Sequence, residues 1–100
     1  MNFIEKYAIK PIKETMSDGT EIWIKELSYK GAVAVACEYS AAEKAIATMI
    51  HGLCDKEGKN VFSEDQRDWV KENLPVPVIQ EIAAKIANLS NRDLVKKSEA

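Results

Sequence analysis

A change in the spacing of apolar residues at about Ser28 constrains the fold of this chain more than any other feature. Before it, over residues 9–27, β-branched and aromatic residues are mixed with charged ones, as in "EIWIKEL", where Ile22 and Ile24 would share one face of a strand and Trp23 and Lys25 the other. After it, apolar residues recur every three or four positions, which is the period of a helix. The sequence therefore predicts strands first and helices afterwards.

The strand-like segment reads as a β-hairpin. Its two runs, "IKETM" and "EIWIKEL", are joined by "SDGT", in which Asp18 and Gly19 can supply the positive φ angles of a tight turn. Two strands alone are marginally stable in water, so the hairpin has to pack on helices. We predict a hairpin over residues 9–27.

Residues 28–54 are predicted to form a long helix. Ser28 suits the N-cap position, and the segment is rich in alanine, the strongest helix former. "SAAE", from Ser40 to Glu43, has the pattern of a capping box and so predicts a kink or break near Ser40. The core-facing stripe of this helix consists of Val35, Tyr39, Ala42, Ile46, Met49 and Leu53.

This helix carries more apolar surface than one stripe requires, since further alanines and Ile50 widen its apolar arc. Either another chain covers the excess, or the hairpin and the last helix do. Aromatic and apolar residues on such a surface are candidates for contact with a partner protein. The candidate partner-binding residues are Trp23, Val35, Tyr39, Ile46, Met49 and Ile50.

The second half of the chain is predicted to contain a turn and two more helices. Residues 55–62 form a turn and an apolar plug at Phe62, and "SEDQ" caps a short helix over 63–73 with Trp69 and Val70 turned inward. "LPVP" ends it, and a C-terminal helix follows over 76–90. Residues 91–100 are predicted as a flexible tail. The whole chain, 1–100, is thus one α+β domain, an N-terminal β-hairpin followed by a mostly helical part.

The stretch "DKEGKNVFSEDQ" resembles a calcium-binding loop only superficially. Asp55 occupies the first ligand place, but Lys59 stands at the fifth and Gln66 replaces the closing bidentate Glu. Gly58 and Asn60 are typical turn residues, and Ser63 begins the next helix cap. A turn followed by a plug explains the stretch better than an ion site.

Composition and motifs argue against several classes of function. A net charge of −2 does not suggest nucleic-acid binding, and no run approaches the ~20 apolar residues of a membrane span. "MNFIEKYAIK" lacks the apolar run of a signal peptide, and Cys37 and Cys54 are expected to be free thiols. His51 has no second pair of ligands at metal-binding spacing, and no nucleophile or phosphate-loop motif is present. We therefore expect a protein that is not an enzyme and needs no cofactor or metal.

The order of these elements resembles the tail assembly chaperones of long-tailed, siphovirus-type bacteriophages. "KELS" at 25–28 stands where that family has a "REL-T/S" phrase. The family's "D-x-x-G-x-x-x-F-[ST]-[DE]-[DE]" phrase is matched by Asp55, Gly58, Phe62, Ser63, Glu64 and Asp65, and the short helix after it contains Trp69, a further structural residue. "LSN" at 89–91 matches the end of the last helix, whereas the two prolines of "NLPVP" depart from the pattern. The resemblance covers roughly residues 9–91.

The resemblance implies a non-catalytic assembly factor that acts as a homo-oligomer. Such proteins bind the tape measure protein, keep it soluble and bring tail tube protein to it. They work in the cytoplasm of the infected bacterial host and are absent from the mature virion. A small virion structural subunit, such as a head–tail connector or tail completion protein, is the alternative that remains open.

Overall fold

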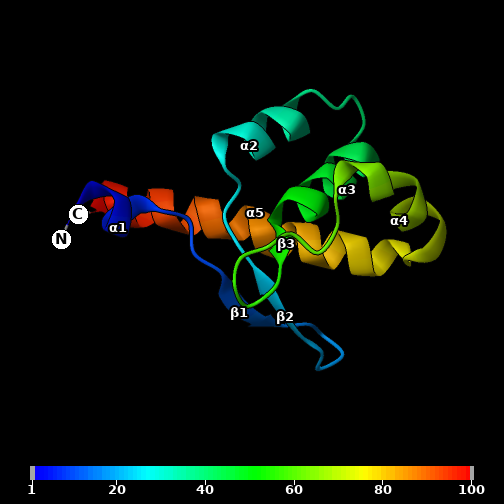
Figure 1. The fold of residues 1–100 in the computed structure, drawn as a ribbon, viewed down its shortest axis with the longest axis horizontal. Helices are drawn as coiled ribbons and strands as arrows, with labels where there is room; N and C mark the ends of the chain where they lie inside the picture. The colour runs from blue at the N-terminus through cyan, green and yellow to red at the C-terminus, as the bar shows by residue number, and fades with distance from the viewer. Residues whose placement is uncertain (1, 100) are drawn as a thin grey trace.

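The computed structural model describes the backbone of residues 2–99 and the side chains of residues 2–89. A three-stranded antiparallel sheet, in the order β1-β2-β3, lies beside a group of helices (Figure 1). The α+β class with an N-terminal hairpin, predicted from the sequence, is confirmed. The elements are α1 (Phe3–Tyr7), β1 (Ile12–Thr15), β2 (Glu21–Ile24), α2 (Tyr29–Ala36), α3 (Ala41–Gly52), β3 (Leu53–Cys54), the 3₁₀ turn η1 (Glu64–Gln66), α4 (Arg67–Asn73) and α5 (Val76–Glu99).

The hairpin turn forms where the sequence places it. Gly19 has φ +91°, a conformation that side-chain-bearing residues rarely adopt, and Thr20 N–H donates to Asp18 Oδ1 at 2.9 Å. The turn is also tied to α5, because Ser17 N–H and Ser17 Oγ donate to the carboxylate of Glu81 at 2.7 and 2.9 Å. The hairpin is therefore fixed to the last helix at its tip.

A third strand, β3, was not predicted. Helix α3 ends at Gly52, and Leu53 is extended, with φ −82° and ψ 125°. Leu53 and Cys54 then pair with Ile24 and Trp23 of β2. Two residues are too few to show a period, so the sequence pattern assigns both to the end of the long helix. This short strand nevertheless turns the hairpin into a sheet that is continuous with α3.

The segment 28–54 forms two helices, with the break at the position that the capping pattern indicates. Helix α2 ends at Ala36 and α3 begins at Ala41. Ser40 has extended backbone angles, and its side chain accepts from Glu43 N–H at 3.0 Å. Four residues between helices let α2 turn back across α3, as Figure 1 shows. The two helices therefore present separate faces.

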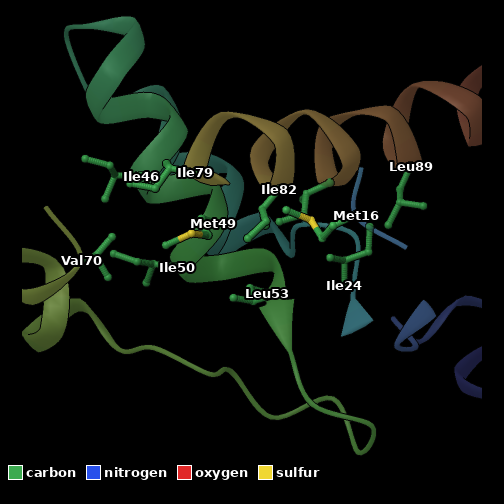
Figure 2. Packing of buried hydrophobic residues seen from close by; sticks show 11 residues of the cluster. Met16, Ile24, Ile46, Met49, Ile50, Leu53, Val70, Ile79, Ile82 and Leu89 are labelled. Atoms are coloured by element: carbon green, nitrogen blue, oxygen red, sulfur yellow. The ribbon is translucent and has the colours of Figure 1, made fainter. Parts of the chain in front are cut away.

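The core lies between α3, α5 and the sheet (Figure 2). Met49 and Ile50 of α3, Ile86 of α5 and Ile24 of β2 are fully buried. Burying one such side chain stabilises a fold by about 1.5–3 kcal/mol, so these contacts dominate its energetics. The buried cluster comprises Met16, Ile24, Ile46, Met49, Ile50, Leu53, Val70, Ile79, Ile82, Ile86 and Leu89.

The last helix is longer than the sequence predicts. Its first turn is set by Pro75, whose carbonyl accepts from Val78 N–H at 3.1 Å and from Ile79 N–H at 3.2 Å. At the other end the backbone stays helical to Glu99, across most of the predicted flexible tail; Ala100 lies outside the described residues. Residues 91–99 hold no Gly or Pro that would stop a helix. Within the described part of the chain, no helix is both long and apolar enough to span a bilayer.

Candidate protein-binding surface

The outer side of α2 carries an apolar stripe that faces solvent. Tyr29, Ala32, Val33 and Ala36 are spaced i, i+3, i+4 and i+7, so they share one helix face. All four are exposed, Tyr29 by 87% and Val33 by 42% of its surface. A helix normally turns such a face to the core. This stripe, which we call the α2 face, is thus a candidate contact surface.

The opposite side of α2 packs on α3 through a very close approach. A Cβ atom added to Gly31 would lie 3.1 Å from His51 Cβ, which is tighter than nine in ten real Cβ contacts. Ala34 and Val35 are half-buried on the same side. Because Gly31 lets the helices meet here, the stripe on the far side of α2 points outward.

Hydrogen bonds hold both ends of α2. Ser28 Oγ accepts from Gly31 N–H at 3.1 Å at the N-terminus, and Lys44 Nζ donates to Val35 O at 3.4 Å near the C-terminus. Glu38, two residues after the last residue of α2, forms an ion pair with Arg67 of α4 at 3.3 Å. Helix α2 is therefore anchored at its two ends and not over its outer face.

Arg67 connects three separate segments. Besides Glu38, its guanidinium contacts Glu43 of α3 at 3.0 Å and Glu64 of η1 at 2.9 Å. The hydrogen bonds to Glu64 hold the pKa of Arg67 above its ordinary value. Glu43 also pairs with Lys71 at 2.6 Å, and this hydrogen bond, reinforced by Arg67, keeps the pKa of the Glu43 carboxyl below its ordinary value. The cluster fixes the α2–α3 connection against α4.

His51 of α3 lines a cavity of about 460 Å³. Its Nε2 atom is buried without a hydrogen bond, and the nearest carboxylate oxygen, on Glu64, is 3.7 Å away. Among the side chains that the structure describes, no three His, Cys, Asp or Glu residues converge as a metal site requires. The cavity is lined by both lysines and glutamates, so its charge favours no single class of ligand.

The candidate residues chosen from the sequence fall into different environments. Ile46, Met49 and Ile50 are core residues, so they are not accessible to a partner in this conformation. Val35 and Trp23 are half-buried, on α2 and on β2. Tyr39 is fully exposed, in the connection between α2 and α3. Three of the six candidate residues therefore face inward.

Tyr29 and Val33 are not among the candidates chosen from the sequence, for an identifiable reason. The predicted stripe, from Val35 to Leu53, assumes one continuous helix with a single phase. The break at 37–40 resets that phase, so α2 and α3 each have their own face. The sequence does contain the helical spacing of Tyr29, Ala32, Val33 and Ala36. It stands out once the Ser40 cap is taken as the boundary between two separate helices.

The motif residues of the 55–69 segment build a turn and a cap. Asp55 Oδ1 accepts from the N–H groups of Glu57 and Lys59, both at 2.9 Å, and Gly58 has φ +89°. Phe62 is half-buried against the core. Ser63 begins the predicted capping box, with its N–H donating to Gln66 Oε1 at 2.9 Å. The carboxylate of Asp55 thus holds the turn by accepting from backbone N–H groups.

Trp69 does not point inward as predicted. It is half exposed, and its ring lies 5.8 Å from that of Phe62 at an interplanar angle of 32°. Its neighbour Val70 is the residue of α4 that enters the core. A short helix can bury one side only, and Val70 occupies that side, so Trp69 covers Phe62 from outside.

The arrangement of helices and strands is similar to that of a known protein structure. No protein-family model and no curated protein matches the chain. Among solved structures, that of the bacteriophage HK97 tail assembly chaperone is similar, with a TM-score of 0.59 and 22% sequence identity. The match covers 89% of this chain and 91% of that one. The chain therefore has the fold of the HK97 tail assembly chaperone.

Proposed function

We propose that this protein is a non-catalytic phage tail assembly chaperone. It binds the tape measure protein, keeps it soluble and promotes assembly of the tail tube around it. The observation that carries this proposal is the uncovered α2 face on a fold shared over nearly its whole length with the HK97 tail assembly chaperone. The family phrases in the sequence support it independently.

The α2 face suits an apolar helical client. Tyr29 offers a large, semi-rigid aromatic ring at one end, and Val33 adds a branched side chain one turn later. Ala32 and Ala36 are small, so the backbone of a second helix can approach closely between them. An apolar helix laid along this face would exchange its water for protein contacts, which is the usual mode of helix recognition.

The small size of the face fits a reversible role. Four exposed side chains, two of them alanine, bury too little surface for a tight individual contact. A long client with many apolar segments would instead be held by many copies at once, each contributing weakly. Homo-oligomers acting in the cytoplasm of the infected host, with tail tube protein as a second partner and no copy retained in the virion, complete the proposal.

The test is co-expression with the tape measure protein encoded by the same phage. The wild-type protein should keep the client soluble and co-purify with it. Val33→Ser should reduce co-purification several-fold. Val61→Ser is the matched control, because Val61 is 48% exposed against 42% for Val33 but lies outside α2. Equal loss in both variants, or full solubility of the client without the protein, would overturn the proposal.

A second measurement separates this function from the alternative of a virion subunit. Mass spectrometry of purified phage particles should detect the tail tube and tape measure proteins and not this chain. Stoichiometric recovery of the chain in particles would instead favour a connector or tail completion protein.

A further inference from the structure

His51, in the last turn of α3, adjoins both α2 and η1. Gly31 of α2 comes so close that an added Cβ atom would lie 3.1 Å from His51 Cβ. Toward η1, Nε2 of the His51 ring lies 3.7 Å from Oε1 of Glu64. Only 16% of the His51 side-chain surface is exposed. The imidazole is therefore part of the packing that seats α2 on the rest of the fold.

The Nε2 atom of His51 is buried and has no hydrogen bond to any residue that the structure describes. Its separation of 3.7 Å from Glu64 Oε1 is too long for one. A neutral imidazole placed here has lost the hydrogen bonds that this nitrogen makes in water and has gained no protein partner, which is unfavourable. A protonated imidazole carries N–H on both ring nitrogens. Nε2 is then a charged donor beside a carboxylate, a combination that gives short, strong hydrogen bonds.

Two other polar side chains near His51 are already hydrogen-bonded elsewhere. Lys25 Nζ donates to Gly58 O at 2.8 Å. Asn60 Nδ2 donates to Ile50 O at 3.2 Å. Neither side chain therefore competes with Glu64 as the partner of Nε2.

Glu64 can accept a hydrogen bond from His51 without giving up its present partner. Its two oxygens accept from Arg67 of α4 at 2.9 and 3.0 Å, and a carboxylate offers about four acceptor positions. Charged side chains from the other elements around His51 line the same cavity, on α2, after β2 and in the turn that follows β3. They are Lys30, Lys25, Glu26 and Glu57.

A hydrogen bond from His51 to Glu64 would support α2 at two places. Near the N-terminus of α2, Gly31 rests on His51. Beyond its C-terminus, Arg67 joins Glu64 to Glu38, at 2.9 and 3.3 Å. Fixing the imidazole to Glu64 therefore steadies the residue beneath α2 and links it to the ion pair that follows the helix.

We propose that His51 and Glu64 form a proton-dependent clamp that holds α2 more firmly when His51 is protonated. The two groups need to approach by only about 1 Å to form a charge-assisted hydrogen bond. The bond requires the imidazolium, so the clamp is closed at lower pH and opens as the pH rises through the range, about 5 to 8, in which histidines lose their charge. Because α2 carries the α2 face, a proton thereby sets how rigidly that face is presented.

Hydrogen exchange on the purified protein, measured between about pH 8 and about pH 6, tests this clamp. Rates are corrected for the pH dependence of intrinsic amide exchange. In the wild type, protection of the amides over Tyr29–Ala36 should rise at least threefold as the pH falls, and more than protection in α5. His51→Gln stays uncharged over this range, so its α2 protection should not depend on pH.

Two glutamate variants separate the clamp from the rest of the ion-pair cluster. Glu64→Gln removes the carboxylate that faces Nε2 and should abolish the pH dependence. Glu38→Gln is the matched control, because it also takes one carboxylate from Arg67 but leaves His51 and Glu64 in place, so the pH dependence should persist. Circular dichroism checks that each variant is folded.

The proposal would be overturned by wild-type α2 protection that does not change with pH. It would equally be overturned by a pH dependence that survives in Glu64→Gln or His51→Gln, or by one that disappears in Glu38→Gln. No client protein enters these measurements, so their outcome is separate from that of the proposed function.

Discussion

Gly52 at the end of α3 lies directly against Ile86 of α5. A Cβ atom at position 52 would fall 2.6 Å from both Cδ1 and Cγ2 of Ile86, a distance that real Cβ atoms do not show. The two helices that hold most of the core are therefore in contact because one residue has no side chain. Ile86 is fully buried, so it has little room to move away.

Gly52→Ala is expected to destabilise the fold by about 1–3 kcal/mol, the usual range for overpacking a filled core. Gly31→Ala is the natural comparison, since its added Cβ would meet His51 at a less severe 3.1 Å. A helical Gly→Ala change also gains up to about 1 kcal/mol of helix propensity. Urea unfolding should therefore rank Gly52→Ala well below Gly31→Ala in stability. Equal stability of the two variants would contradict the close contact with Ile86.

Phe62 and Trp69 are expected to stabilise each other. Phe62→Ala should cost no more than the lower end of the ~3–5 kcal/mol typical of a buried phenylalanine, because Phe62 is only half-buried. The tilted ring pair should appear as a coupling of about 0.5–1.5 kcal/mol in a double-mutant cycle with Trp69→Ala. Strictly additive losses would mean that Trp69 does not cover Phe62 in solution.

The Arg67 cluster predicts how stability changes in acid. The pKa of Glu43 is lower in the folded protein than its ordinary value near 4.5, chiefly through its hydrogen bond with Lys71. The unfolded chain therefore binds a proton at Glu43 more readily than the folded protein does. The stabilisation from Glu43 is fully present above its unfolded-state pKa, and it is lost as the pH falls through the lowered pKa of the folded state. Unfolding free energies measured from about pH 6 downward should decrease, and Glu43→Gln should flatten this part of the curve. If the unfolding free energy of Glu43→Gln decreases with falling pH as steeply as that of the wild type, Glu43 does not cause the loss of stability in acid.

Arg67→Met should loosen α2 as well as reduce stability. It removes the partner of three carboxylates, from Glu38, Glu43 and Glu64, and leaves them close together. Hydrogen exchange in α2 and in the 37–40 connection should accelerate more than exchange in α5. Glu14→Gln, which breaks only the long contact of 3.8 Å with Lys85, is the control and should leave α2 unchanged.

The two cysteines are expected to react at very different rates. Cys37 is exposed, whereas Cys54 is buried in β3, and burial raises the pKa of the Cys54 thiol. The thiolate is the reactive form, so a raised pKa and low exposure act in the same direction. A thiol reagent near neutral pH should modify one cysteine in the native protein and both after unfolding. Rapid modification of both in the native state would contradict the burial of β3.

The sequence predicted the parts of the fold that depend on local chemistry. The "SDGT" turn, the Ser40 and Ser63 caps and the proline-bounded start of α5 each follow from what a few adjacent residues prefer. The features it missed depend on distant partners. Strand β3 exists because Leu53 and Cys54 meet β2, and Trp69 faces outward because Val70 already fills the core position.

The same distinction explains the candidate binding residues. A helical period says which residues share a face, but not which face the rest of the chain covers. Met49 and Ile50 were predicted to contact a partner, whereas α5 and the sheet cover them. The sequence shows that Tyr29 and Val33 share a helix face, but the exposure of that face follows from the position of α2 across α3.

Hydrogen–deuterium exchange on the protein with and without tape measure protein tests the central claim most directly. If the client binds the α2 face, amides over Tyr29–Ala36 should become protected in the complex, and Val33→Ser should abolish that protection while Val61→Ser retains it. Protection confined to other elements, with α2 exchanging as fast as in the free protein, would contradict the account.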